Sequence, residues 1–182
     1  MTSQTSSETI TINGPDGSFS GYLAKPAGDG PFPAIVVIQE IFGVNAVMRG
    51  ICDDLAKQGY LALSPDLFWR IDITDQSEEE WAKAFELFNA FDVDKGMVDV
   101  QATIDAARKL PGANGKVGAV GYCLGGQLAY LTAARTDADA AVGFYGVNLQ
   151  NRTDEAGNIT KPLMLHIAGK DEFVPADAQD AI

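Results

Sequence analysis

The sequence has 182 residues, with 13 Lys and Arg against 25 Asp and Glu, a formal net charge of −12, and 46% hydrophobic residues. This is the composition of a globular chain, and its length suits a single domain over residues 1–182. The negative charge argues against nucleic acid as a partner. The two cysteines and one histidine exclude a disulfide framework and a His-rich metal site.

No segment of the sequence is typical of a membrane protein or a secreted one. No apolar run approaches the ~20 residues of a membrane span, and the polar start lacks the pattern of a signal peptide. We therefore expect a soluble, cytoplasmic protein, either a monomer or a homodimer.

The hydrophobic pattern predicts a hairpin followed by alternating strands and helices. Alternating residues at 8–13 and 19–23 flank a turn at 14–17. Further strands are expected at 33–38, 60–64, 116–121, 140–145 and 162–167, and helices at 47–55, 81–88, 100–110 and 124–131. The acidic run 75–80 is expected to open a helix, and 148–160 to be a polar loop. This order predicts an α/β fold with three layers, in which a mostly parallel sheet carries an N-terminal antiparallel hairpin.

The strongest chemical signal is the segment Gly121-Tyr122-Cys123-Leu124-Gly125-Gly126. It lies between a predicted strand and a predicted helix and matches the nucleophile-elbow pattern G-x-S-x-G, with Cys in place of Ser. The tight turn requires small residues two before and two after Cys123, and both are glycine. A helix N-terminus favours a thiolate, and the Leu124 N–H would be one oxyanion-hole donor. The alternative is that Cys123 is a buried small hydrophobic residue.

A second signal follows the buried strand at 33–38. Glu40 and Ile41 come at the carboxyl edge of the sheet, where ligand sites of open α/β sheets gather. The elbow needs a second backbone N–H from this loop, and Ile41 is the natural candidate. Glu40 is either a functional acid or a partly exposed loop carboxylate. Cys52, within a predicted helix, is interpreted as a packing residue.

A third signal follows the last predicted strand. Asp171 fits the acid of a nucleophile–acid–histidine order, or else is a turn aspartate before a helix that begins at Pro175. The only histidine, His166, precedes Asp171 within an apolar strand. We interpret it as a core histidine, because from that strand it cannot easily accept a proton from Cys123 and also pair with Asp171.

Together these residues resemble the dienelactone hydrolase (carboxymethylenebutenolidase) family of α/β-hydrolases. The matching motifs span nearly the whole chain in the family's order, and a Cys-nucleophile elbow is uncommon among α/β-hydrolases. They are Gln39-Glu40-Ile41-Phe42-Gly43, Ser64-Pro65-Asp66-Leu67, Ala90-Phe91-Asp92, the elbow segment 121–126, and Asp171-Glu172-Phe173-Val174-Pro175.

The resemblance implies an α/β-hydrolase fold and a role for each residue. Cys123 would be the nucleophile and Asp171 the acid of a Cys-His-Asp triad. Glu40 would accept the resting thiol and help to generate the thiolate, and the N–H groups of Ile41 and Leu124 would form the oxyanion hole. The implied reaction is hydrolysis of an ester bond in a lactone or small ester, without cofactor or metal.

Two departures from the family pattern qualify this expectation. The family's histidine lies beyond Asp171, after a further helix, so we expect the chain to be C-terminally incomplete, to lack the last strand and helix, and to be nearly inactive as given. The family's Arg and Tyr that hold a substrate carboxylate correspond to Trp81 and Phe85. These side chains suit an apolar or aromatic ester better than an anion, and Arg70 and Lys83 are the basic residues left for that role.

Two other functions compete with the hydrolase. One is a non-catalytic α/β-hydrolase pseudoenzyme that binds a small hydrophobic ligand in the same pocket. The other is a thiol redox protein that uses Cys123, which the lack of a C-x-x-C motif disfavours.

Overall fold

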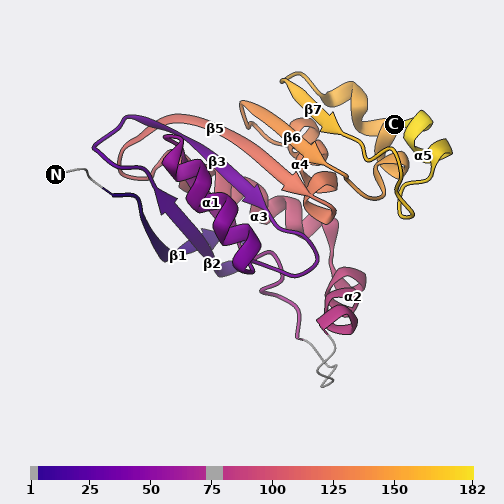
Figure 1. The fold of residues 1–182 in the computed structure, drawn as a ribbon, viewed down its shortest axis with the longest axis horizontal. Helices are drawn as coiled ribbons and strands as arrows, with labels where there is room; N and C mark the ends of the chain where they lie inside the picture. The colour runs from indigo at the N-terminus through magenta and orange to yellow at the C-terminus, as the bar shows by residue number, and fades with distance from the viewer. Residues whose placement is uncertain (1–3, 73–79) are drawn as a thin grey trace.

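A seven-stranded sheet forms the centre of the molecule in the computed structural model, which describes residues 4–72 and 80–182 (Figure 1). The strands lie in the order β1-β2-β4-β3-β5-β6-β7. The hairpin β1–β2 and the pair β2–β4 are antiparallel, and the other pairs are parallel, as predicted. The strands are β1 (Ser6–Gly14), β2 (Gly17–Lys25), β3 (Phe32–Ile38), β4 (Leu61–Pro65), β5 (Ala113–Tyr122), β6 (Ala140–Phe144) and β7 (Leu163–His166).

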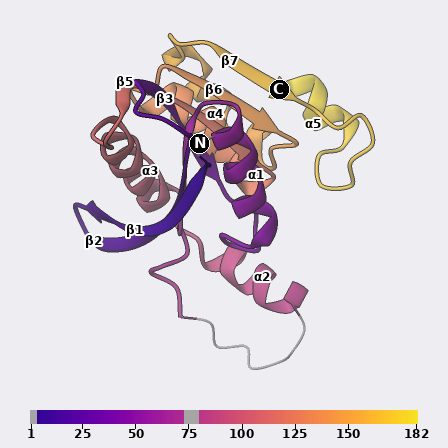
Figure 2. The ribbon, with the colours of Figure 1, turned by 60° about the vertical axis from the view of Figure 1, so that its left-hand side comes forward.

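Helices on both faces of the sheet complete the predicted three layers (Figures 1 and 2). Helix α1 covers one face of the sheet, and α3 and α4 cover the other. Successive strand residues point to opposite faces, so Val37 packs with residues of α1 and Val36 with residues of α3 and α4. Asn45 caps α1 by accepting hydrogen bonds from two backbone N–H groups, at 3.0 and 3.1 Å. The helices are α1 (Ala46–Lys57), α2 (Glu80–Ala90), α3 (Val93–Arg108), α4 (Leu124–Arg135) and α5 (Ala176–Ala181).

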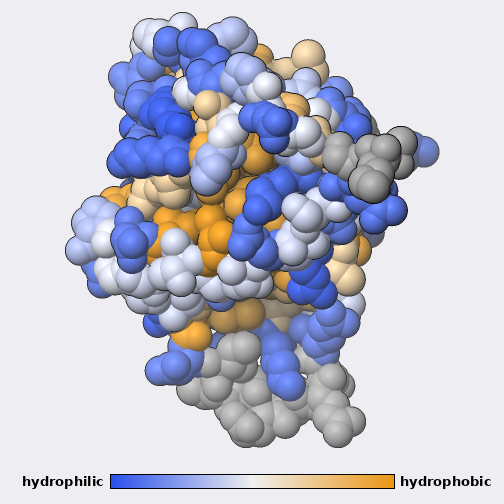
Figure 3. Space-filling model, turned by 90° about the vertical axis from the view of Figure 1, so that its left-hand side faces the viewer, coloured by the Kyte–Doolittle hydropathy of each residue, from blue (hydrophilic) through white to orange (hydrophobic). Residues whose placement is uncertain are grey.

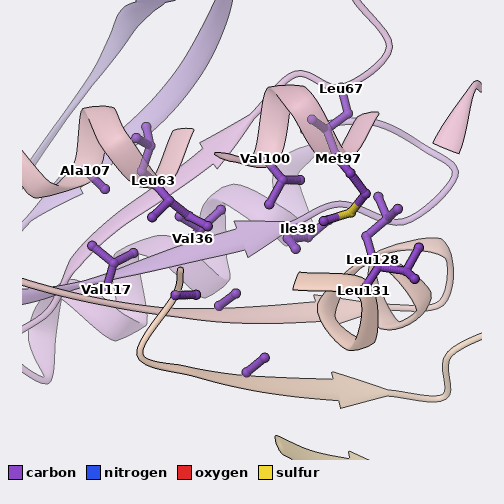
Figure 4. Close-up of a cluster of buried hydrophobic side chains, with 14 of the residues drawn as sticks. Val36, Ile38, Leu63, Leu67, Met97, Val100, Ala107, Val117, Leu128 and Leu131 are labelled. Atoms are coloured by element: carbon purple, nitrogen blue, oxygen red, sulfur yellow. The ribbon is translucent and has the colours of Figure 1, made fainter. Parts of the chain in front are cut away.

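The larger hydrophobic core lies between the sheet and the pair α3–α4 (Figure 4). Val36 and Ile38 of β3 face Val100 of α3 and Leu128 of α4, and all four are fully buried. Each such side chain stabilises the fold by roughly 1.5–3 kcal/mol on burial. The core therefore fixes the carboxyl ends of β3 and β5, where the candidate site begins.

The segment after β6 differs from its prediction. Residues 148–160 are not a loop, since Leu149–Asn158 form a 3₁₀ helix. Arg135 of α4 binds both oxygens of Glu155 at 2.6 Å, and the Tyr130 hydroxyl donates to the carbonyl of Arg152 at 2.8 Å. These contacts with a distant helix order the segment, and its polar composition gave no sign of them.

The prediction of a core histidine is also wrong. His166 is exposed, and its ring stacks on Phe144 with centroids 4.3 Å apart. The cause is the place of β7 at the edge of the sheet, where the neighbouring Met164 is 57% exposed. Of the acidic run, only Glu80 falls within the described residues, where it opens α2 as expected; residues 75–79 lie outside them.

The surface at the end of the molecule that carries the N-terminal hairpin is mainly hydrophilic, with hydrophobic residues visible chiefly in recesses (Figure 3). Among the helices of residues 4–72 and 80–182, none has the length and apolar character needed to cross a bilayer. The buried apolar residues of α1, α3 and α4 instead pack against the sheet.

Candidate active site

Cys123 occupies the turn between β5 and α4 in a conformation that non-glycine residues seldom adopt, with φ 54° and ψ −113°. Its N–H donates to the carbonyl of Phe144 at 3.0 Å, and its own carbonyl accepts from Gly126 at 2.9 Å. A conformation of this kind costs about 1–3 kcal/mol and persists where surrounding contacts enforce it. The turn holds the sulfur at the carboxyl edge of the sheet.

The glycines around Cys123 are required by close backbone packing. A Cβ atom at Gly121 would collide with the backbone of Gly125. A Cβ atom at Gly125 would collide with the carbonyls of Ile38 and Gln39 at the end of β3. Glycine thus lets the start of α4 lie directly against the loop that carries Glu40.

The surroundings of Cys123 keep its thiol protonated at rest. Burial raises the pKa of this thiol most, and the charges of Glu40 and Asp171 raise it further. A hydrogen bond from the Leu124 N–H acts in the opposite direction and lowers the pKa. A nucleophilic thiolate at this position therefore needs a neighbouring group that accepts the proton.

A cavity of about 400 Å³ brings most of the predicted site residues together. Cys123, Glu40, Asp171 and Ile41 line it with Trp81 and Phe85 of α2. Leu124 is not a lining residue, since its side chain is buried in the core, but its backbone N–H donates a hydrogen bond to the Cys123 sulfur. The catalytic and binding roles of these residues stay predictions. The remaining lining residues are Phe42, Phe88, Tyr145, Val147, Asn148 and Phe173.

Aromatic rings form one wall of the cavity. Trp81 meets Phe42 edge to face at 4.8 Å and lies 5.9 Å from Phe85. Within the described part of the chain, no basic side chain lines this cavity. Arg70 is held elsewhere by Asp99 and stacks over a tryptophan, and Lys83 is not a lining residue. The wall thus offers apolar contact and no counter-charge for an anion.

Glu40 and Asp171 are each held by a specific hydrogen bond. The Tyr145 hydroxyl donates to Glu40 Oε1 at 3.2 Å, and Asp171 Oδ1 accepts from the N–H of Phe173 at 2.9 Å. Gln39, fully buried, ties the Glu40 loop to the segment after β4 by accepting from the Leu67 N–H at 3.0 Å. No sequence motif predicted these contacts of Tyr145 and Gln39, although Gln39 directly follows a predicted strand and Tyr145 ends one, both at the carboxyl edge of the sheet.

His166 and Cys52, the remaining histidine and cysteine side chains, do not line the cavity. Cys52 is fully buried on the inner face of α1, in the smaller core cluster, which confirms the packing interpretation. Cys123 packs against other clusters, and both cysteines are free, so no disulfide joins the two thiols in this structure.

Comparison with known proteins agrees with this geometry. The dienelactone hydrolase family model matches residues 19–182. The chain belongs to the dienelactone hydrolase family. Its class is therefore that of hydrolases acting on ester bonds.

Individual relatives cover most of the chain. A protein of Azospirillum brasilense assigned as a carboxymethylenebutenolidase is 52% identical over 93% of the chain and 74% of its own length. The carboxymethylenebutenolidase of Pseudomonas putida is 44% identical over 96% of the chain and 76% of its own length. A crystal structure of a Klebsiella pneumoniae protein assigned as a dienelactone hydrolase superposes with a TM-score of 0.86 at 27% identity, covering 97% of this chain and 78% of that one. These likenesses confirm the predicted fold class and family.

Proposed function

We propose that the protein is a thiol-dependent hydrolase of small neutral esters or lactones with apolar or aromatic groups. Cys123 acts as the nucleophile, Asp171 as the triad acid and Glu40 as the carboxylate that takes the thiol proton. The backbone N–H groups of Ile41 and Leu124 form the oxyanion hole. The observation that carries this proposal is the strained turn that presents Cys123 to a cavity shared with two carboxylates.

Acylation of Cys123 can proceed with the substrate and these residues. Glu40 accepts the thiol proton as the sulfur attacks the ester carbonyl carbon and a C–S bond forms. The two N–H groups stabilise the negative oxygen of the tetrahedral intermediate. The C–O bond then breaks, and the alcohol leaves with the proton from Glu40.

Water completes the cycle. A water molecule attacks the thioester carbonyl, the C–S bond breaks, and the carboxylic acid is released with the thiol restored. His166 is not a lining residue of the cavity, and of the two carboxylates that line it the charge of Glu40 raises the pKa of the thiol more than that of Asp171, which supports Glu40 as the proton acceptor. A histidine acting with Asp171 would accelerate both steps.

The substrate class follows from the lining of the cavity. Trp81, Phe85 and Phe42 supply apolar surface, and the only charged groups among the described lining residues are Glu40 and Asp171. An anionic substrate would meet two negative charges without a cation to compensate them. The same proposal places the reaction in the cytoplasm, where a reduced thiol persists.

A second candidate is a non-catalytic protein that binds a small hydrophobic ligand in this cavity. The observations that favour it are the raised pKa of Cys123 and the position of His166 outside the cavity. Acylation of the thiol separates the two functions, because a binding protein has no need to react with its ligand.

The test is the pre-steady-state release of p-nitrophenolate from p-nitrophenyl acetate by the 182-residue chain. We expect a burst of about one equivalent per chain, since acylation needs only the nucleophile and its acceptor. Prior treatment with iodoacetamide should abolish the burst. An aryl ester of similar size that bears a carboxylate should react at least about tenfold more slowly.

Three results would contradict the proposal in whole or in part. A burst that survives alkylation of Cys123 would exclude it as the nucleophile. Absence of any burst, together with saturable binding of the intact ester, would favour the binding protein. A carboxylate-bearing ester that reacts as fast as the neutral one would refute the proposed substrate class alone.

A further inference from the structure

Tyr145 is fixed in place by its backbone and by neighbouring rings. It directly follows β6 with φ 40°, which is unusual for a residue with a bulky side chain. Its N–H donates to the carbonyl of His166 at 2.8 Å, and its ring lies 6.1 Å from Tyr122 and 6.4 Å from Phe144. The strained backbone and the two rings hold Tyr145 at the cavity that Cys123 also lines.

The hydroxyl of Tyr145 connects two distant parts of the sequence at this cavity. It donates to Oε1 of Glu40 at 3.2 Å. Burial, followed by the charge of Glu40, raises the pKa of Tyr145 to about 12, so the hydroxyl keeps its proton at neutral and mildly alkaline pH. In the part of the chain that the structure describes, no ion pair engages the Glu40 carboxylate. Tyr145 is therefore the side chain that restrains it there.

We propose that Tyr145 is a positioning residue that holds the Glu40 carboxylate beside the Cys123 thiol, an inference that rests on the proposed function. With Oε1 engaged by the tyrosine, the second carboxylate oxygen is left to accept the thiol proton. Without the hydroxyl, the carboxylate loses its tether and turns toward water, which solvates a negative charge better than the cavity does. The thiol then loses a negative neighbour.

The charged groups around Cys123 shift the pKa of its thiol, so this pKa reports the position of Glu40. Glu40 comes from the loop after β3 and Asp171 from the loop after β7, and the charges of both raise the pKa of the thiol. The Tyr145 hydroxyl lies at the same cavity on the segment after β6, and the ring of Tyr122 on β5 lies 6.1 Å from that of Tyr145. Removing the tether changes the position of Glu40 alone, so the thiol pKa should fall while the Asp171 contribution stays.

The experiment is the pH dependence of iodoacetamide alkylation at Cys123, read by mass spectrometry of the Cys123 peptide. The chain is compared with Tyr145→Phe, Glu40→Gln and the double variant. Tyr22→Phe is the matched control, because the Tyr22 hydroxyl also donates to a carboxylate, that of Asp53 at 2.9 Å, and does not line this cavity.

We expect Glu40→Gln to lower the pH midpoint of alkylation by roughly one unit, and Tyr145→Phe to lower it by roughly half a unit. In the double variant, Tyr145→Phe should add nothing to Glu40→Gln, since the tether has no carboxylate left to hold. Tyr22→Phe should leave the midpoint unchanged. Glu40→Asp, which keeps the charge but shortens its reach, provides a second way to break the tether and should lower the midpoint as Tyr145→Phe does.

Several outcomes would overturn the inference. One is an unchanged midpoint in Tyr145→Phe or, if that variant does not fold, in Glu40→Asp. Another is a Tyr145→Phe shift of equal size with and without Glu40, which indicates a general structural effect. Alkylation needs no ester, so failure of the p-nitrophenolate burst with these shifts intact would refute the proposed function and leave the positioning role standing.

Discussion

Cys52 and Cys123 are both enclosed by protein, and burial raises the pKa of each thiol, yet the fold gives them different surroundings. Cys52 lies within α1 with no exposed surface, and only the charge of Asp53 adds to burial, raising its pKa to about 12. Cys123 opens onto a cavity, and the Leu124 N–H at its sulfur opposes the effect of burial. The comparison shows that a strained turn at a sheet edge, and not the residue type, gives a cysteine access and a hydrogen-bond donor.

The largest expected difference between the two cysteines is in ester chemistry. Cys123→Ala should reduce acylation by p-nitrophenyl acetate by about 10³-fold or more, because the attacking atom is removed. Cys52→Ala should keep the rate within about threefold, since Cys52 is a core residue of α1. Stopped-flow release of p-nitrophenolate measures both, with thermal unfolding to show that each variant is folded. A loss as large in Cys52→Ala as in Cys123→Ala would remove the distinction.

The glycines beside the two cysteines provide the next comparison. Gly121→Ala places a Cβ against the backbone of Gly125, and overpacking of this kind costs about 1–3 kcal/mol or more. Gly50 lies within α1, and a Cβ there meets nothing within 4 Å. Gly50→Ala should therefore raise the free energy of unfolding by about 0.5–1 kcal/mol.

Urea unfolding of the two alanine variants measures this contrast. The midpoints should move in opposite directions with similar slopes. A Gly121→Ala variant as stable as the original chain would show that the elbow backbone has room to relax, and the proposed strain at Cys123 would then need another cause.

The features of this molecule that the sequence predicts are those that depend on residues close together in the chain. The continuous apolar run of β3 and the glycines at 121 and 125 are local patterns, and the structure contains the strand and the tight turn that they predict. The family resemblance extended that prediction to Glu40 and Asp171, which the structure brings to the same cavity as Cys123.

What the sequence did not reveal depends on contacts between distant segments. The bond between Tyr145 and Glu40 joins residues 105 positions apart, and neither residue type implies the other. The 3₁₀ helix forms because Arg135 reaches Glu155 from another helix. His166 is exposed because β7 is an edge strand; the expected lack of the family's last strand implied this edge, although the apolar pattern of β7 alone does not distinguish an edge strand from a central one.

Alkaline pH should lower the free energy of unfolding through the buried thiol of Cys52. The pKa of Cys52 is about 12 in the folded chain, above the ordinary value of about 8.5 expected on unfolding. The native state therefore favours the protonated thiol, and its contribution is complete below about pH 8.5 and is lost as the pH rises toward 12. The loss reaches at most about 1.4 kcal/mol per pH unit.

Urea unfolding between about pH 8 and pH 10 tests this linkage. The free energy of unfolding should fall by about 1–2 kcal/mol less in Cys52→Ala than in the original chain, because the variant has no proton to release there. Equal slopes in the two proteins would mean that the Cys52 thiol ionises as readily when folded as when unfolded.

The smallest expected effect concerns the apolar wall of the Cys123 cavity. Trp81 is 59% exposed yet lines that cavity, whereas Val47, on the same helix as Cys52, is 60% exposed and does not. An aromatic contact is worth about 0.5–1.5 kcal/mol, so Trp81→Ala should slow acylation by p-nitrophenyl acetate about three- to tenfold at subsaturating ester. Val47→Ala should leave the rate unchanged. Vinyl acetate carries the same acyl group without a ring, and its reaction should be almost insensitive to Trp81→Ala. A loss of equal size for both esters would assign Trp81 to the shape of the cavity as a whole, and the preference for aromatic esters would then have to come from Phe85 or Phe42.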